Sequence, residues 1–115
     1  MESEKQIFND ITPQEARKLI NENLNNPNFL LLDVRTPDEF FSAHIEGSKN
    51  LDYHGINFNN ELNKLDKNKK YLLYCRSGVR SANVFNLMRS AGFNKIYNML
   101  GGITLWADEG FPLVR

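Results

Sequence analysis

The chain contains a single cysteine, Cys75, and its neighbours suit thiolate chemistry. Cys75 follows the apolar run at residues 71–74 and opens the segment Cys75-Arg76-Ser77-Gly78-Val79-Arg80-Ser81, after which a helical pattern begins. The N-terminus of a helix offers unpaired N–H groups, and guanidinium groups also stabilise an anion. Such surroundings lower a cysteine pKa from about 8.5 to roughly 3.5–7.5. We therefore interpret Cys75 as a nucleophile.

A buried packing role is the alternative for Cys75, because free cysteine is among the most often buried residue types. Arg76 and Arg80 argue against it, since unpaired charge beside an apolar site is costly. We expect the loop to curl so that its amides face the sulfur. Gly78 would supply the backbone freedom for this curl, and Arg76 or Arg80 would bind an incoming oxyanion. This interpretation assigns substrate binding to Arg76, Ser77, Gly78, Val79 and Arg80.

Two continuous apolar runs, at residues 29–32 and 71–74, are expected to carry the site on a sheet. Unbroken apolar strands are typical of a parallel sheet that is covered on both faces. Residues 48–51 and 96–99 are weaker strand candidates. The alternation of helical and strand patterns predicts a three-layer α/β sandwich.

Two helix starts have almost the same sequence, Thr12-Pro13-Gln14-Glu15 and Thr36-Pro37-Asp38-Glu39. Each places threonine as the N-cap, proline at the first helical position and glutamate at the third, which is a capping box. The first helix is expected to continue as far as Leu24, within an asparagine-rich stretch, and the second to end by residue 47.

A third helix is expected from about Ser81 to Gly92, and a closing helix around Trp106 should pack on the core. Residues 57–60 and 67–70 have the composition of solvated connections. The core-facing stripe of the third helix is predicted to comprise Val84, Leu87, Met88 and Ala91.

The carboxyl ends of parallel strands meet at one edge of a sheet, where ligands bind. Asp33 and Arg35 should therefore lie near Cys75, and we expect them to support the loops through hydrogen bonds. Glu39 is a candidate partner for Arg35. His44 is expected to be a hydrogen-bonded, partly buried residue rather than a general base, because a thiolate in a cationic cradle requires no base.

The composition bounds the other possibilities. The 115 residues suit one domain, 1–115, and 14 basic side chains balance 14 acidic ones, so neither nucleic acid nor a membrane is an expected partner. One cysteine and two histidines allow no internal disulfide and no four-ligand site without carboxylates, so we expect no metal and no cofactor. The polar start, Met1–Gln6, lacks a secretory or spanning segment, which makes a cytoplasmic location the default.

Taken together, these motifs resemble those of the single-domain rhodaneses, the thiosulfate sulfurtransferase family. The resemblance covers nearly the whole chain: the stretch 32–35 with Glu39-Phe40, the stretch 44–50, the loop 75–81 and the stretch Gly101 to Trp106 stand in the family's order and spacing. Ala43, Glu46 and Ser48 depart from the family's usual glycine, proline and alanine, and they lie away from the loop.

This resemblance implies a three-layer sandwich with a mainly parallel sheet of about five strands and helices on both faces. It also implies that Cys75 takes sulfur from a small anionic donor such as thiosulfate, or from a persulfide, and holds it as a persulfide. Cyanide, a thiol or a protein would accept that sulfur. An external acceptor is required, because the chain has no second cysteine.

Three alternatives stay open at this point. Phosphatases and arsenate reductases resemble this fold, but the phosphatase loop has five residues between cysteine and arginine, whereas this chain has four, Arg76 to Val79. A non-catalytic binding module is expected to lose the cysteine or a loop arginine, and this chain keeps both. A sulfur carrier without rapid turnover would have the same sequence.

Overall fold

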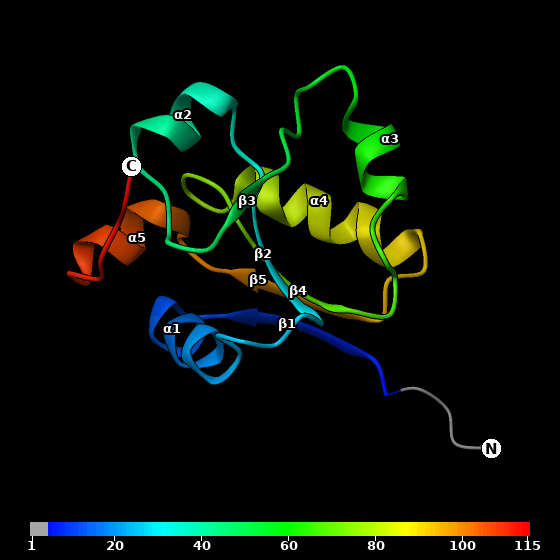
Figure 1. Ribbon diagram of the computed structural model, residues 1–115, viewed down its shortest axis with the longest axis horizontal. Helices are drawn as coiled ribbons and strands as arrows, with labels where there is room; N and C mark the ends of the chain where they lie inside the picture. The colour runs from blue at the N-terminus through cyan, green and yellow to red at the C-terminus, as the bar shows by residue number, and fades with distance from the viewer. Residues whose placement is uncertain (1–4) are drawn as a thin grey trace.

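The computed structural model describes residues 5–115, and the first four residues of the polar start considered above lie outside this range. The fold is a five-stranded parallel sheet with strand order β1-β5-β4-β2-β3 and helices on both faces (Figure 1). This arrangement confirms the predicted three-layer α/β sandwich.

The two continuous apolar runs form the neighbouring strands β2 (Phe29–Asp33) and β4 (Lys70–Tyr74). The two weaker candidates also form strands, β5 (Lys95–Met99) beside β4 and the short β3 (Lys49–Asn50) beside β2. Leu72 and Leu73, in the middle of β4, are almost fully buried. The sheet is therefore covered on both faces at its centre, as the unbroken apolar pattern predicts.

The edge strand β1 (Ile7–Ile11) was not predicted from the sequence, which suggested only a polar lead into the first helix. Its residues pair in parallel with β5, from Ile7 opposite Lys95 to Ile11 opposite Met99. Asn9 and Asp10 are exposed, and only Ile11 is buried. An edge strand needs few apolar residues, so its sequence pattern is weak.

Both predicted capping boxes are present, at the start of α1 (Pro13–Glu22) and of α2 (Pro37–Ser42). Leu24 lies beyond the end of α1 and is exposed. The third predicted helix is α4 (Val79–Ser90), in which Val84 and Met88 are buried and Ala91 packs against the same core at its end. Leu87 was wrongly assigned to the buried stripe, because it is 43% exposed.

Residues 57–60 are not simply a solvated connection, because the helix α3 (Phe58–Asn63) begins within them. Phe58 and Leu62 are buried, and their four-residue spacing places both on the core-facing side. Asparagines fill the exposed positions and hide this short apolar stripe in the sequence. The predicted closing helix is α5 (Gly102–Asp108), which buries Ile103 and Trp106.

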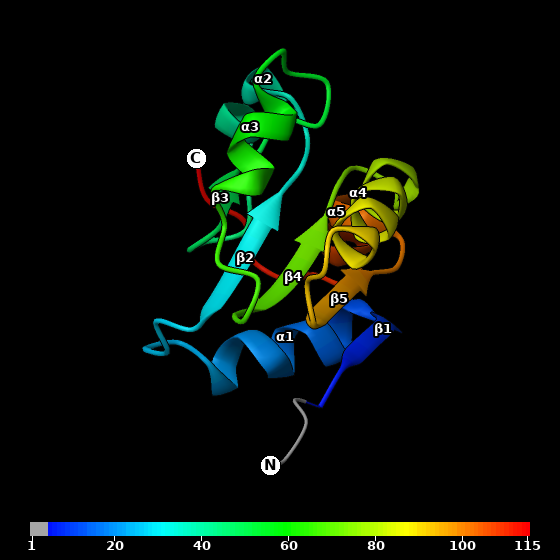
Figure 2. The same cartoon turned by 90° about the vertical axis from the view of Figure 1, so that its right-hand side faces the viewer.

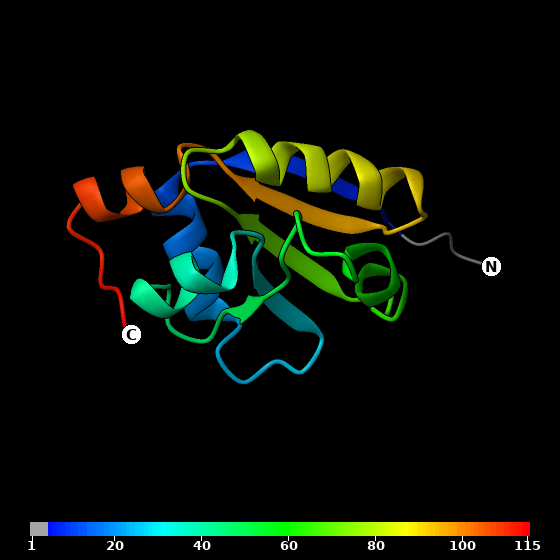
Figure 3. The same ribbon diagram turned by 90° about the horizontal axis from the view of Figure 1, so that it is seen from above.

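The helices form two layers with separate hydrophobic cores. Helices α3 and α4 pack on one face of the sheet, in a core that includes Phe58 and Met88, while α1 and α5 pack on the other, in a core that includes Ala16 and Trp106. Figure 2 shows α1 and α4 on opposite sides of the sheet, and Figure 3 shows α4 lying lengthwise along β5. No helix among the described residues is long and apolar enough to cross a membrane.

Candidate active site

The loop that follows β4 is the centre of the candidate site. β4 ends at Tyr74, Cys75 follows it, and α4 begins at Val79. Gly78 is the N-cap of α4 and has φ +111°, a conformation that L side chains rarely adopt. The loop therefore turns sharply enough to bring the first residues of α4 back to the sulfur of Cys75.

Cys75 is only 1% exposed, and hydrogen-bond donors surround its sulfur. The amide of Gly78 donates to Sγ over 3.1 Å. Burial by itself raises the pKa of the Cys75 thiol. Hydrogen bonds to the sulfur lower it by more, so the overall pKa is below the ordinary value; they come from the Ser81 hydroxyl and from the backbone amides of Ser81, Gly78 and Ser77. The predicted amide cradle is present, and it favours the thiolate.

Ser81 is a contributor to the site that the sequence reasoning did not single out. It is fully buried in the first turn of α4, where its hydroxyl donates to the Gly78 carbonyl over 3.3 Å and accepts from the Cys75 thiol over 3.4 Å. When Cys75 is ionised, the same hydroxyl can rotate and donate to the sulfur. Its place at the end of the loop motif was the only available signal.

Helix α5 supports the loop from the other side. The Ile103 amide donates to the Cys75 carbonyl over 2.9 Å, and the Thr104 amide donates to the Arg76 carbonyl over 3.1 Å. The amides at the start of a helix have no partners within that helix, so these two bonds give partners both to the first amides of α5 and to the carbonyls of the loop. The loop is therefore held between α4 and α5, and the residues after Gly101 belong to the site's framework.

Arg80 is bound to Glu39 rather than free in the loop. Its Nη1 donates to Glu39 Oε1 over 2.7 Å, and its Nη2 donates to Oε2 over 3.0 Å. The predicted pairing of Glu39 with Arg35 is thus wrong. The hydrogen bonds from Arg80, opposed by partial burial and aided by bonds from Thr36, lower the pKa of Glu39 to about 2. This carboxylate joins α2 to the first turn of α4.

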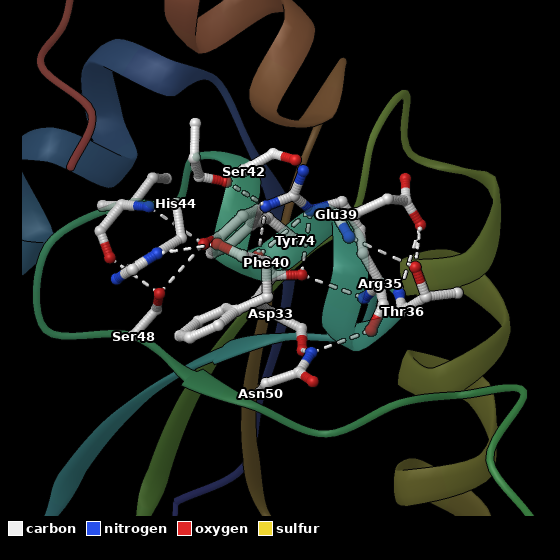
Figure 4. Close-up of polar contacts among 12 residues, drawn as sticks. Asp33, Arg35, Thr36, Glu39, Phe40, Ser42, His44, Ser48, Asn50 and Tyr74 are labelled. Carbon is white, nitrogen blue, oxygen red and sulfur yellow. Dashed lines mark hydrogen bonds and ion pairs between the residues drawn. The ribbon is translucent and has the colours of Figure 1, made fainter. Parts of the chain in front are cut away.

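Asp33 and Arg35 pair with each other at the end of β2. Arg35 Nε donates to Oδ1 over 3.0 Å and Nη2 donates to Oδ2 over 2.6 Å, while Asp33 is completely buried and Arg35 is 6% exposed. Nη2 also reaches the Ala43 carbonyl at 2.6 Å, and Asn50 Nδ2 donates to the Asp33 and Arg35 carbonyls (Figure 4). These bonds support the expectation that the pair holds neighbouring segments in place.

The segment after α2 is attached to β4 through Tyr74. The Tyr74 phenol accepts from the Ile45 amide over 3.0 Å and lies 3.0 Å from the Ser48 hydroxyl. Burial, followed by the charge of Asp33, raises the phenol pKa, so Tyr74 stays neutral. His44 is half-buried, stacks on Phe40 and has Nδ1 2.8 Å from the Phe40 carbonyl oxygen, as expected of a structural histidine (Figure 4).

The remaining loop side chains face solvent. Arg76, Ser77 and Val79 are exposed, and the Arg76 guanidinium has no ion-pair partner among residues 5–115. Within the same range, no three His, Cys, Asp or Glu side chains cluster as metal ligands would. The site therefore combines a buried, anion-favouring sulfur with one exposed cationic side chain beside it.

Comparison with known proteins agrees with this geometry. The model of the rhodanese-like domain family matches residues 12–109. A probable adenylyltransferase/sulfurtransferase, MoeZ, of Mycobacterium tuberculosis is 35% identical over 102 residues, which are 89% of this chain but only 25% of that protein. A sulfurtransferase of Allochromatium vinosum is 34% identical over 85 residues, which are 74% of this chain and 78% of that protein.

The fold is also found in solved structures. The crystal structure of a rhodanese-related protein from Thermoplasma volcanium superposes with a TM-score of 0.76 at 30% sequence identity, covering 93% of this chain and 98% of that one. The family match and the shared fold agree with the loop, its buried cysteine and the sheet that carries it. This chain belongs to the rhodanese-like domain family.

Proposed function

We propose that this protein is a sulfurtransferase that carries sulfane sulfur on Cys75. The observation that carries the proposal is the buried Cys75 sulfur, with the Gly78 amide 3.1 Å away and a lowered pKa. A thiolate is the nucleophilic form of cysteine, and the amides that stabilise it also suit the terminal sulfur anion of a persulfide.

In the first step, the Cys75 thiolate attacks the outer sulfur of thiosulfate. A new S–S bond forms to Cys75, the S–S bond of thiosulfate breaks, and sulfite leaves with the electron pair of that bond. The exposed guanidinium of Arg76 is the group we assign to the anionic donor, since Arg80 is already paired with Glu39. The relatives described above as sulfurtransferases support sulfur transfer as the reaction.

In the second step, an external nucleophile attacks the outer sulfur of the Cys75 persulfide. Cyanide would take the outer sulfur and be released as thiocyanate, and a thiolate would be released as a persulfide. In both cases the Cys75 thiolate is regenerated. Cys75 is the only cysteine of the chain, so no internal thiol can take the sulfur as an intramolecular disulfide. We therefore propose a small thiol or a protein thiol as the acceptor.

The geometry gives less support to phosphatase chemistry. A phosphatase of this type needs a protonated general acid beside the leaving group. Among the described residues, the two carboxylates bonded into the site's framework are Glu39, whose pKa is about 2, and Asp33, which is buried against Arg35. Glu39 is ionised at neutral pH, and Asp33 is enclosed away from solvent.

The deciding experiment is intact-mass analysis after incubation with thiosulfate, before and after addition of cyanide. We expect one added sulfur on the wild-type protein, its removal by cyanide with release of thiocyanate, and no adduct on Cys75→Ser. An adduct that forms but does not turn over with any donor would indicate a sulfur carrier. Absence of an adduct with both thiosulfate and a persulfide donor would contradict the proposal.

A further inference from the structure

Two glycines, Gly101 and Gly102, begin helix α5, and Gly102 lies against the backbone of the catalytic loop. A Cβ atom at Gly102 would be 2.5 Å from the carbonyl oxygens of both Cys75 and Arg76. Real Cβ atoms do not approach backbone this closely, so any side chain at this position would push the loop and the helix apart. Gly102 also has φ +59°. Both properties require glycine at this position.

The contact that Gly102 permits controls the orientation of loop peptides. Thr104 N donates to the Arg76 carbonyl over 3.1 Å. In a trans peptide the carbonyl and the following N–H point in opposite directions, so fixing the Arg76 carbonyl also fixes the Ser77 amide. The Ser77 amide is one of the donors that lower the pKa of Cys75. Helix α5 thus acts on the sulfur without touching it.

We propose that Gly102 is a positioning residue for Cys75, because the missing side chain lets helix α5 hold the two loop carbonyls that turn the loop amides toward the sulfur. The inference rests on the proposed use of Cys75 as a nucleophile. It adds that the reactivity of the thiolate depends on a helix some thirty residues further along the chain, through contacts that only the backbone makes.

The test is the rate of Cys75 alkylation by iodoacetamide as a function of pH, in wild type, Gly102→Ala and Gly110→Ala. Gly110 is a matched control: it follows the other end of α5, has φ +81°, and a Cβ there would meet nothing within 4 Å. Both variants carry the strain of a left-handed alanine, but only Gly102→Ala disturbs the loop. The single cysteine makes the alkylation signal unambiguous.

We expect Gly102→Ala to move the midpoint of the pH profile upward and to slow alkylation roughly tenfold at pH values below the wild-type midpoint, the effect of one lost hydrogen bond to a charged group. Gly110→Ala should keep the wild-type midpoint while losing thermal stability. A wild-type midpoint in Gly102→Ala would overturn the proposal. So would an equal shift in both variants, which would mark general destabilisation.

Should Gly102→Ala fail to fold, hydrogen exchange of the Thr104 amide in the wild-type protein tests the same coupling. If α5 stabilises the thiolate, ionisation must stabilise the α5 contact by the same amount. Protection of Thr104 should therefore rise across the ionisation of Cys75, and should not do so in Cys75→Ser. Equal behaviour of the two proteins would overturn the proposal.

These readouts require no sulfur donor. If Gly102→Ala shifts the alkylation profile but the wild-type protein forms no persulfide, sulfur transfer is refuted and the positioning role is kept. If the wild-type protein forms the persulfide but Gly102→Ala leaves the profile unshifted, the positioning role is refuted and sulfur transfer is kept. The two proposals therefore fail separately.

Discussion

The Cys75 sulfur combines almost complete burial with hydrogen bonds that favour its anionic form. Burial alone would make Cys75 an inert packing residue, and it is the amides of the loop and the Ser81 hydroxyl that reverse the balance. The loop arginines have different surroundings, since Arg80 is engaged by Glu39 and Arg76 is open to solvent. At the residue scale, hydrogen bonding outweighs desolvation.

Cys75→Ser tests whether the sulfur serves chemistry rather than packing. We expect complete loss of persulfide formation, because a serine hydroxyl is not ionised near neutral pH, together with an unfolding midpoint close to that of wild type. Intact mass and urea unfolding monitored by circular dichroism measure the two effects. Transfer near the wild-type level would contradict the assignment of Cys75 as the nucleophile.

Ser81→Ala should raise the pKa of the Cys75 thiol, since it removes the largest favourable contribution to the thiolate. A hydrogen bond to a charged group is worth about 1.5 kcal/mol, so alkylation should slow roughly tenfold at pH values below the wild-type midpoint. The measurement is the pH dependence of Cys75 alkylation. Ser42→Ala is the control, because the Ser42 hydroxyl donates only to the exposed Asp38 carbonyl; an equal effect in both variants would refute the role of Ser81.

At the scale of elements, the site depends on contacts between helices that are distant in sequence. Glu39 caps α2, with its Oε1 3.1 Å from the Thr36 amide nitrogen, and the same carboxylate pairs with Arg80 in α4. The side chain of Glu39 is 29% exposed and that of Arg80 21%, so solvent screens the pair in part. The pair fixes the position of α2 relative to the loop.

Glu39→Gln should lower the free energy of unfolding by roughly 1 kcal/mol at neutral pH, because glutamine keeps the cap but not the ion pair. The pKa of Glu39 is lowered to about 2 in the folded state, below its value of about 4.3 in an unfolded chain. Its stabilising contribution is therefore present above about pH 4.3 and is lost as the pH falls toward 2.

Urea unfolding of wild type and Glu39→Gln between neutral pH and about pH 2 measures this dependence, and the difference between them should shrink as the pH falls. Glu61→Gln is the matched control, because Glu61 forms an exposed pair with Lys64 at 3.6 Å. The control should change stability by less than about 0.5 kcal/mol. A difference for Glu39→Gln that persists at low pH would show that the ion pair is not its source.

At the scale of the whole molecule, the parallel sheet brings the ends of β2, β4 and β5 to one edge. Val34 N donates to the Tyr74 carbonyl over 3.0 Å, which places the Asp33–Arg35 pair beside the strand that ends at Cys75. The Gly101–Gly102 turn that follows β5 lies against the same loop. One edge therefore gathers three separate stretches of the chain: the end of β2, the loop that carries Cys75 and the turn after β5.

The single cysteine leads to a kinetic prediction for the whole protein. Once formed, the Cys75 persulfide should persist after the donor is removed, and its decay rate should rise in proportion to the concentration of an added thiol. Time-resolved intact mass measures this decay. Decay at a rate independent of the acceptor, in dilute protein, would contradict the requirement for an external acceptor.

The predictions that succeeded depend on short sequence patterns. The two capping boxes and the central strands β2 and β4 need only neighbouring residues to be recognised, and they were placed correctly. Strand β1 and helix α3 were missed because exposed asparagine and aspartate interrupt their few apolar positions. A segment with a weak pattern adopts its structure because it pairs or packs with segments elsewhere in the chain.

The sequence by itself located the candidate nucleophile and the loop around it, because Cys75, the glycine and the start of α4 lie within seven consecutive residues. Only the tertiary structure decided the partners of the charged side chains. Glu39 lies four residues from Arg35 but pairs with Arg80, which is 41 positions away. The support from α5 was likewise visible only in the folded chain. Such contacts depend on how the strands are ordered in the sheet, and residue spacing does not encode that order locally.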